Sequence, residues 1–145
     1  MPTTPPSPDR PHAATATRAP LASSPRTALV AGLLDLVAVL VFATVGRASH
    51  EEGLSVAGVL EVAWPFLAGL VAGWLVTRAW RRPLAVWPTA VGVLVLTWGG
   101  GMALRAATGA GTAASFLLVA AGFLALVLVG WRAVALGVLQ ARRPR

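Results

Sequence analysis

Asp35 is the residue whose type and position are best suited to chemistry, because it lies alone within the apolar run of residues 28–45. A carboxylate inside hydrocarbon must be neutralised, paired or used in function. It could bind a proton or cation during transport, or it could pair with a cation and fix the register of neighbouring helices. Arg132 is the candidate partner, since it lies within the last apolar run of the chain.

The positions of Asp35 and Arg132 predict that their side chains can meet. Each lies seven residues from an end of its run, Ala28 or Leu139, which is roughly 10 Å at about 1.5 Å per residue. The residues that share a helical face with them are Gly32, Val39, Phe42 and Gly46 for Asp35, and Ala121, Ala125 and Leu128 for Arg132. We therefore predict an intramembrane ion pair or polar site at Asp35 and Arg132. In the alternative, Arg132 extends to the membrane interface and Asp35 bonds to hydroxyl or backbone groups.

A second polar cluster is predicted on the outer side of the membrane, at the end of the apolar runs away from Asp35 and Arg132. Its members are Arg47, His50, Glu61 and Arg105. Either arginine could neutralise Glu61. His50 and the two glutamates that follow it could bind a divalent ion, but adjacent loop residues rarely supply convergent ligands. We therefore interpret them as loop charges and predict neither a metal nor a cofactor.

The composition excludes most soluble classes of protein. Of 145 residues, 57% are hydrophobic and only 12% are charged, which is too few charges to cover a soluble surface. There is no cysteine, so thiolate chemistry and disulfides are absent. Neither His-Glu-x-x-His nor Gly-x-Ser-x-Gly occurs, and we predict that the protein is not an enzyme. The net charge of +7 comes from arginines spread between apolar runs, which argues against nucleic acid as a partner.

Four apolar runs define the fold. They cover about residues 28–46, 56–79, 84–104 and 112–138. Each approaches or exceeds the roughly 20 residues that a helix needs to cross a bilayer, and none alternates as a barrel strand would. The sequence therefore predicts an all-α, four-helix antiparallel bundle within a transmembrane domain at residues 27–139. Residues 1–26 hold seven of the eleven prolines and predict a disordered basic tail, and residues 140–145 form a second basic tail.

Small residues and prolines mark the connections and contacts. The link at 81–83 is so short that the second and third runs must form an antiparallel hairpin. Gly109 and Gly111 predict the last turn, with Thr112 as the N-cap of the final helix. Gly69 and Gly73 form a small-xxx-small motif, which serves either packing within the bundle or contact between two copies.

The arginines predict the orientation of the bundle. Nine lie in the two tails and the loop region between the second and third runs, whereas only Arg47 and Arg105 lie near helix ends on the other side. By the positive-inside rule, both termini are cytoplasmic. The expected location is the cell inner (plasma) membrane, as a multi-pass protein.

The motifs of the chain resemble a bacterial integral-membrane family, the Domain of Unknown Function 3054 family. They are Asp35-Leu, Phe42-Ala-Thr-Val-Gly-Arg-Ala-Ser-His50, Trp64-Pro-Phe66, Gly73-Trp74, Gly101-Met-x-Leu-Arg105, Ser115-Phe116 and Gly130-Trp-Arg132. The resemblance covers roughly residues 29–135. It implies a four-helix membrane protein without an established activity, with recurring polar positions at Asp35, Arg47, His50, Arg105 and Arg132.

Two functions are compatible with these features. The first is a small transporter or channel-like protein in which Asp35 faces a polar path, and four helices would then need a dimer to enclose it. The second is a structural or accessory subunit that scaffolds a larger membrane complex, with buried ion pairs serving helix register. The expected partners are the lipid bilayer and either a second copy of the chain or an unidentified membrane protein.

Overall fold

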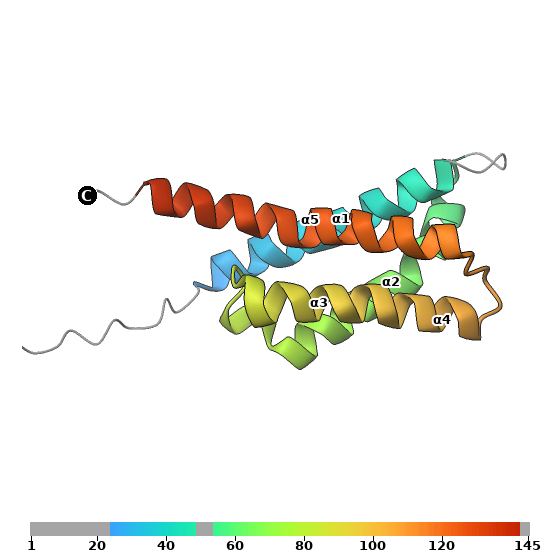
Figure 1. The fold of residues 1–145 in the computed structure, drawn as a ribbon, viewed down its shortest axis with the longest axis horizontal. Helices are drawn as coiled ribbons and strands as arrows, with labels where there is room; N and C mark the ends of the chain where they lie inside the picture. Colours follow the sequence, from blue (N-terminus) through green and yellow to red (C-terminus); the bar gives the residue numbers. More distant parts are fainter. Residues whose placement is uncertain (1–23, 49–53, 143–145) are drawn as a thin grey trace, which may run out of the picture.

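The computed structural model describes residues 24–48 and 54–142 and places them in four antiparallel spans (Figure 1). The spans are α1 (Pro25–Ala48), α2 (Val56–Thr77), a composite third span (Val86–Ala107) and α5 (Ala114–Ala141), each long and apolar enough to cross a membrane. We call the end of the bundle where Pro25 and Ala141 lie the terminal end, and the opposite end the loop end. The predicted fold class, an all-α antiparallel membrane bundle, is confirmed.

Local chemistry explains where the first two helices begin and end. Ser24 accepts a hydrogen bond from the Thr27 amide at 3.2 Å, and Pro25 follows it, an order typical of a helix start. The helix α1 therefore begins three residues before the predicted Ala28. Ser55 caps α2 through the Gly58 amide at 3.1 Å. At the other end of α2, Arg78 adopts a left-handed conformation with φ 51° and its amide donates to the last carbonyls.

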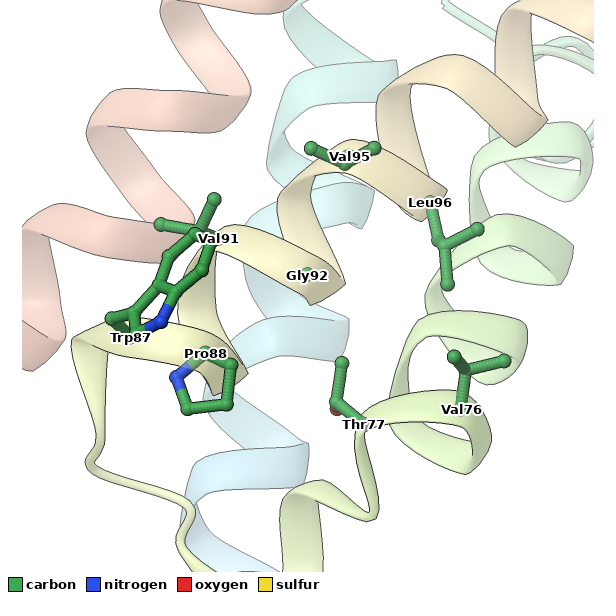
Figure 2. A pocket seen from close by; sticks show the side chains of 8 residues that line it. All are labelled: Val76, Thr77, Trp87, Pro88, Val91, Gly92, Val95 and Leu96. Atoms are coloured by element: carbon green, nitrogen blue, oxygen red, sulfur yellow. The ribbon is translucent and has the colours of Figure 1, made fainter.

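The third span is not a single regular α-helix. It consists of the π-helix η2 (Val86–Ala90), α3 (Val91–Val95), the π-helix η3 (Leu96–Gly100) and α4 (Gly101–Ala107). Trp87 lies outside the helical region at φ −111° and ψ 134°, and Pro88, which has no amide hydrogen, follows it (Figure 2). The regular turns therefore begin after Trp87, although the apolar run starts at Leu84.

The short 3₁₀-helix η1 (Ala79–Arg81) joins α2 to the third span at the terminal end, and residues 108–113 join the third span to α5 at the loop end. Gly109 has φ 73°, a conformation that favours glycine, and forms the predicted turn. The predicted N-cap at Thr112 is wrong. Ala113 holds the N-cap position of α5 without a side-chain hydrogen bond, because the helix begins two residues later than the apolar run.

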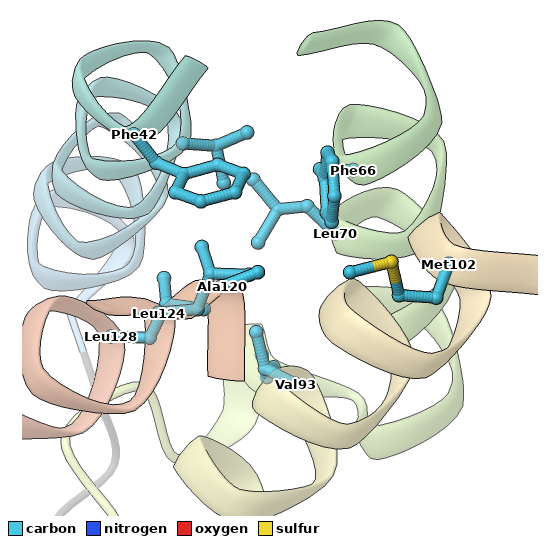
Figure 3. Packing of buried hydrophobic residues seen from close by; sticks show 10 residues of the cluster. Phe42, Phe66, Leu70, Val93, Met102, Ala120, Leu124 and Leu128 are labelled. Atoms are coloured by element: carbon cyan, nitrogen blue, oxygen red, sulfur yellow. The ribbon is translucent and has the colours of Figure 1, made fainter. Parts of the chain in front are cut away.

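The core lies where the four spans meet (Figure 3). Phe42 and Phe66 contact edge to face with ring centroids 4.9 Å apart, and Leu124 packs into the same cluster. The buried residues of α5 are Ala120, Leu124, Leu128 and Arg132. Ala121 and Ala125, which were predicted to face α1, are half-buried. Ala121 and Ala125 lead to Leu128 at spacings of four and three residues, and Ala120 and Leu124 lead to it at spacings of four. Helical spacing alone therefore does not show which of these two rows is buried.

Gly69 and Gly73 pack within the bundle, as one of the two interpretations predicted. A Cβ atom on Gly69 would lie 2.5 Å from the Leu96 carbonyl oxygen, and one on Gly73 would lie 2.9 Å from Val93 Cα. The absence of side chains therefore lets α2 approach the backbone of the third span. Between apolar helices in lipid, such close contact stabilises by van der Waals packing, since removal from water contributes little.

Candidate functional site

Asp35 and Arg132 form a bidentate ion pair inside the bundle. Arg132 Nη1 lies 2.8 Å from Asp35 Oδ1, and Nη2 lies 2.6 Å from Oδ2. Both side chains have an exposed fraction of 0%. Parallel N–H···O bonds between a guanidinium and a carboxylate are charge-assisted and fix the relative orientation of both groups. The structure thus brings together the two residues predicted from their depth, because α1 and α5 are neighbours.

Two tryptophans complete the environment of the Asp35 carboxylate. Trp74 Nε1 donates to Oδ2 at 2.9 Å, and Trp131 Nε1 donates to Oδ1 at 3.0 Å. Each carboxylate oxygen therefore accepts two hydrogen bonds. We call Asp35, Trp74, Trp131 and Arg132 the Asp35 cluster.

The guanidinium of Arg132 has partners beyond the carboxylate. Its Nε donates to the Pro83 carbonyl at 2.8 Å, and Nη1 also donates to the Leu128 carbonyl at 2.6 Å. Its Cζ atom lies 4.5 Å from the ring centroid of Trp131, a cation–π distance. Four of the five N–H groups of Arg132 are therefore engaged: the single Nε hydrogen, both Nη1 hydrogens and one Nη2 hydrogen.

Each part of the bundle at this level supplies at least one member of the Asp35 cluster or a partner to it. Asp35 comes from α1, Trp74 from α2, and Trp131 and Arg132 from α5. Pro83 lies in the link before the third span and is itself buried. Gly32, one turn before Asp35, lies beside the indole, and a Cβ there would make an ordinary van der Waals contact with Trp74 Cη2 at 3.4 Å. The cluster therefore connects segments that are distant in sequence.

The geometry of the Asp35 cluster is suited to fixing helix positions. A carboxylate has about four lone-pair positions for hydrogen bonds, and here four protein donors occupy them. A buried pair of this kind brings little net stability, but removing one partner leaves a charge without compensation. The arrangement therefore penalises any displacement of α1 relative to α5.

The structure does not assemble the second polar cluster as predicted. Glu61 is exposed on α2, and within residues 24–48 and 54–142 no ion pair joins it to Arg47 or Arg105. Arg47 lies at the end of α1 beside the first turn of α2, where a Cβ on Gly58 would lie 2.6 Å from its Nε. His50 lies outside the described residues. Glu61 projects away from the bundle because it shares the outer face of α2 with Trp64, which is 43% exposed.

Arg105 does not pair with Glu61 and instead contacts the turn at the loop end of the bundle. Its Nη2 donates to the Gly111 carbonyl at 3.1 Å, and its Cζ lies 4.8 Å from the ring centroid of Phe116. These contacts hold the turn between α4 and the start of α5. In the described part of the chain, no three His, Asp or Glu side chains lie close enough together to hold a metal ion.

The positions of Asp35 and Arg132 in the sequence predicted the charged pair, but neither the two indole donors nor the Pro83 carbonyl was predicted. A signal for the indoles existed, because a Trp N–H that is buried needs an acceptor and Trp74 and Trp131 lie within apolar runs. The Pro83 carbonyl carried no signal, since a backbone acceptor is common to every residue.

Comparison with known proteins identifies a family. The chain matches the family described as protein of unknown function (DUF3054) over residues 32–135, a region that contains the whole Asp35 cluster. No curated protein and no solved structure matches the chain. Because the match covers most of the sequence, the chain belongs to the DUF3054 family of proteins of unknown function.

Proposed function

We propose that this protein is a structural or accessory subunit that scaffolds a larger membrane complex, and that Asp35 serves helix register rather than transport. The observation that supports the proposal is the saturation of the Asp35 carboxylate by Arg132, Trp74 and Trp131. A group that carries a proton or cation needs a free acceptor position, or donors that leave in each cycle. All of its donors here come from packed helices.

The predicted transporter function is disfavoured by the same contacts. Transport requires that Asp35 face a polar path, whereas the carboxylate is fully buried against the buried guanidinium of Arg132 and two half-buried indoles. Separating Asp35 from Arg132 during a cycle would leave two buried charges unpaired, at a cost of about 3–5 kcal/mol for each interrupted pair. A static role avoids this cost.

The helix α5 is the best candidate surface for a scaffolded partner. Only 17% of the most apolar 18-residue stretch of α5 is buried inside the bundle, less than in the other three spans. On this helix, Leu118 and Leu126 are 76% and 72% exposed. In this proposal the protein has no catalytic role of its own. The arginine distribution further supports an inner (plasma) membrane location with both termini in the cytoplasm.

A flux assay combined with partner recovery tests this proposal. The scaffold function predicts no proton- or cation-coupled flux by the wild-type protein in proteoliposomes. It also predicts a membrane partner recovered by crosslinking at a fixed stoichiometry, whose yield falls in Asp35→Asn but not in the exposed control Arg142→Gln. Wild-type flux that disappears in a normally folded Asp35→Asn protein would establish transport instead.

A further inference from the structure

An apolar groove opens on the outside of the bundle at the terminal end. It has a volume of about 470 Å³ and lies between the end of α2 and the first half of the third span (Figure 2). Val76 and Trp87, on its two sides, are 73% and 76% exposed. The other residues that line it include Thr77, Val91, Val95 and Leu96. The groove is separate from the Asp35 cluster, and the inference drawn from it is independent of the scaffold proposal.

The local structure explains why the groove is apolar. The Thr77 hydroxyl donates to the Gly73 carbonyl at 2.7 Å, so its polar group is engaged by its own helix. Its methyl group faces the third span, where a Cβ on Gly92 would lie 2.5 Å from Thr77 Cγ2. Gly92 therefore allows α3 to approach α2 at the base of the groove. The walls therefore present mostly hydrocarbon to a ligand.

Positive charge lies at the terminal end of this groove. Arg78 directly follows the lining residues Val76 and Thr77, and Arg82 lies in the same link four residues later. Both arginines are exposed. The acidic residues of the described chain are Asp35, which Arg132 holds, and Glu61, which lies toward the loop end of α2. Within the described chain, no other carboxylate is available to neutralise Arg78 and Arg82.

We propose that this groove binds one acyl chain of an anionic phospholipid whose phosphate lies against Arg78 and Arg82. Guanidinium groups bind phosphate oxygens through charge-assisted, often bidentate, hydrogen bonds. Trp87 is placed beside the expected headgroup, where amphipathic indole rings are favoured. The groove opens toward the lipid-facing surface of α2, since neighbouring Val71 and Leu75 are 59% and 60% exposed.

Charge favours a lipid over a second copy of the chain as the occupant. Two copies with the same membrane orientation, related by a two-fold axis, would place Arg78 and Arg82 of both chains at the same depth. Pairing the two grooves would therefore bring like charges together. An anionic phospholipid instead supplies both the hydrocarbon that the groove accommodates and the negative charge that the arginines lack.

Competition between two lipids tests the charge requirement. The purified full chain is equilibrated with equimolar dioleoylphosphatidylglycerol and dioleoylphosphatidylcholine, and retained lipid is counted by native mass spectrometry. We expect one retained phosphatidylglycerol per chain, with a preference on the order of 30-fold from two arginines. The double variant Arg78→Gln/Arg82→Gln should lose most of this preference. The matched control Arg26→Gln/Arg142→Gln, which removes two exposed arginines at the same end, should keep it.

A second pair of variants tests the groove itself. Val95→Trp fills the groove and should abolish retention, whereas Val119→Trp, the same change at a 66% exposed position of α5, should not. Thermal unfolding establishes that each variant is folded. Equal retention of both lipids by the wild-type protein would overturn the proposal. An equal loss of lipid preference in the two double arginine variants would do the same. Disulfide crosslinking between copies carrying Val95→Cys would also overturn it, by identifying the groove as an interface between chains.

Discussion

Arg132 and Asp35 are 97 residues apart in sequence, yet two hydrogen bonds of 2.8 and 2.6 Å join the guanidinium of one to the carboxylate of the other. Neither side chain is exposed. This contact links the first helix to the last, and the indoles of Trp74 and Trp131 hold the same carboxylate from α2 and α5. These four residues therefore hold three helices of the bundle together.

Removing either charge should destabilise the bundle more than removing both. In Asp35→Asn or Arg132→Gln the remaining charge stays buried without its partner, and we expect a loss of about 3–5 kcal/mol in the free energy of unfolding. The double variant should recover part of this loss. Unfolding by sodium dodecyl sulfate in bicelles measures all three proteins. The control is Glu61→Gln, which removes an exposed carboxylate and should change stability by less than about 0.5 kcal/mol. Wild-type stability in Arg132→Gln would contradict the role of the pair.

The two indole donors should contribute measurably and unequally. Trp74→Phe removes one hydrogen bond to a charged acceptor, a loss of about 1.5–3 kcal/mol. Trp131→Phe should lose more, because it also weakens the 4.5 Å contact between the ring and the Arg132 guanidinium. Trp87→Phe serves as the control, since that ring is 76% exposed and should be close to neutral. Equal stability of all three variants in the same unfolding assay would show that the indoles contribute nothing.

The glycines of α2 should be intolerant of even one methyl group. Gly69→Ala places a Cβ 2.5 Å from the Leu96 carbonyl oxygen, and backbone atoms cannot move aside as a flexible side chain can. We expect a loss of about 1–3 kcal/mol without a change in oligomeric state. Gly122→Ala, on α5 with nothing within 4 Å of the added atom, is the control. Dissociation of an oligomer in Gly69→Ala, with the monomer unaffected, would restore the interpretation of this motif as a contact between copies.

Chemical labelling can determine the membrane orientation of the bundle, which is predicted from the arginines. The chain has no cysteine, so single cysteines introduced at exposed Gly111 and Gln140 report the two ends of the bundle. We expect a membrane-impermeant maleimide to label Gly111→Cys in spheroplasts and Gln140→Cys only in inverted vesicles. The reverse pattern would place the termini outside.

The sequence predicted the fold well because helix length and hydropathy in a membrane leave few alternatives. Four apolar runs separated by short links require an antiparallel arrangement, and the four spans of the structure correspond to them. Helix ends were less predictable. The first helix extends to Pro25 because polar caps and arginines continue a helix beyond the apolar run. The π-helical turns Val86–Ala90 and Leu96–Gly100 of the third span were not predictable, because no periodicity in the sequence encodes them.

The Asp35 cluster was only partly predictable from the sequence. Depth and helical face were enough to propose that Asp35 meets Arg132, since few charges compete inside an apolar bundle. The indole donors could not be predicted, because the sequence does not show the direction in which each Trp side chain points. The contrast with Glu61 is informative, because proximity to two arginines near one end suggested a pair, whereas the helical face of α2 directs it outward.

The long sequence separation within the Asp35 cluster has a consequence for biogenesis. Asp35 is synthesised 97 residues before Arg132, and 39 residues before Trp74. At about 5–20 residues per second, the carboxylate exists for roughly 5–20 s without the guanidinium. A chain that stops before α5 retains this unneutralised acid indefinitely. Insertion of the final helix therefore supplies the cation that pairs with Asp35 and completes the molecule electrostatically.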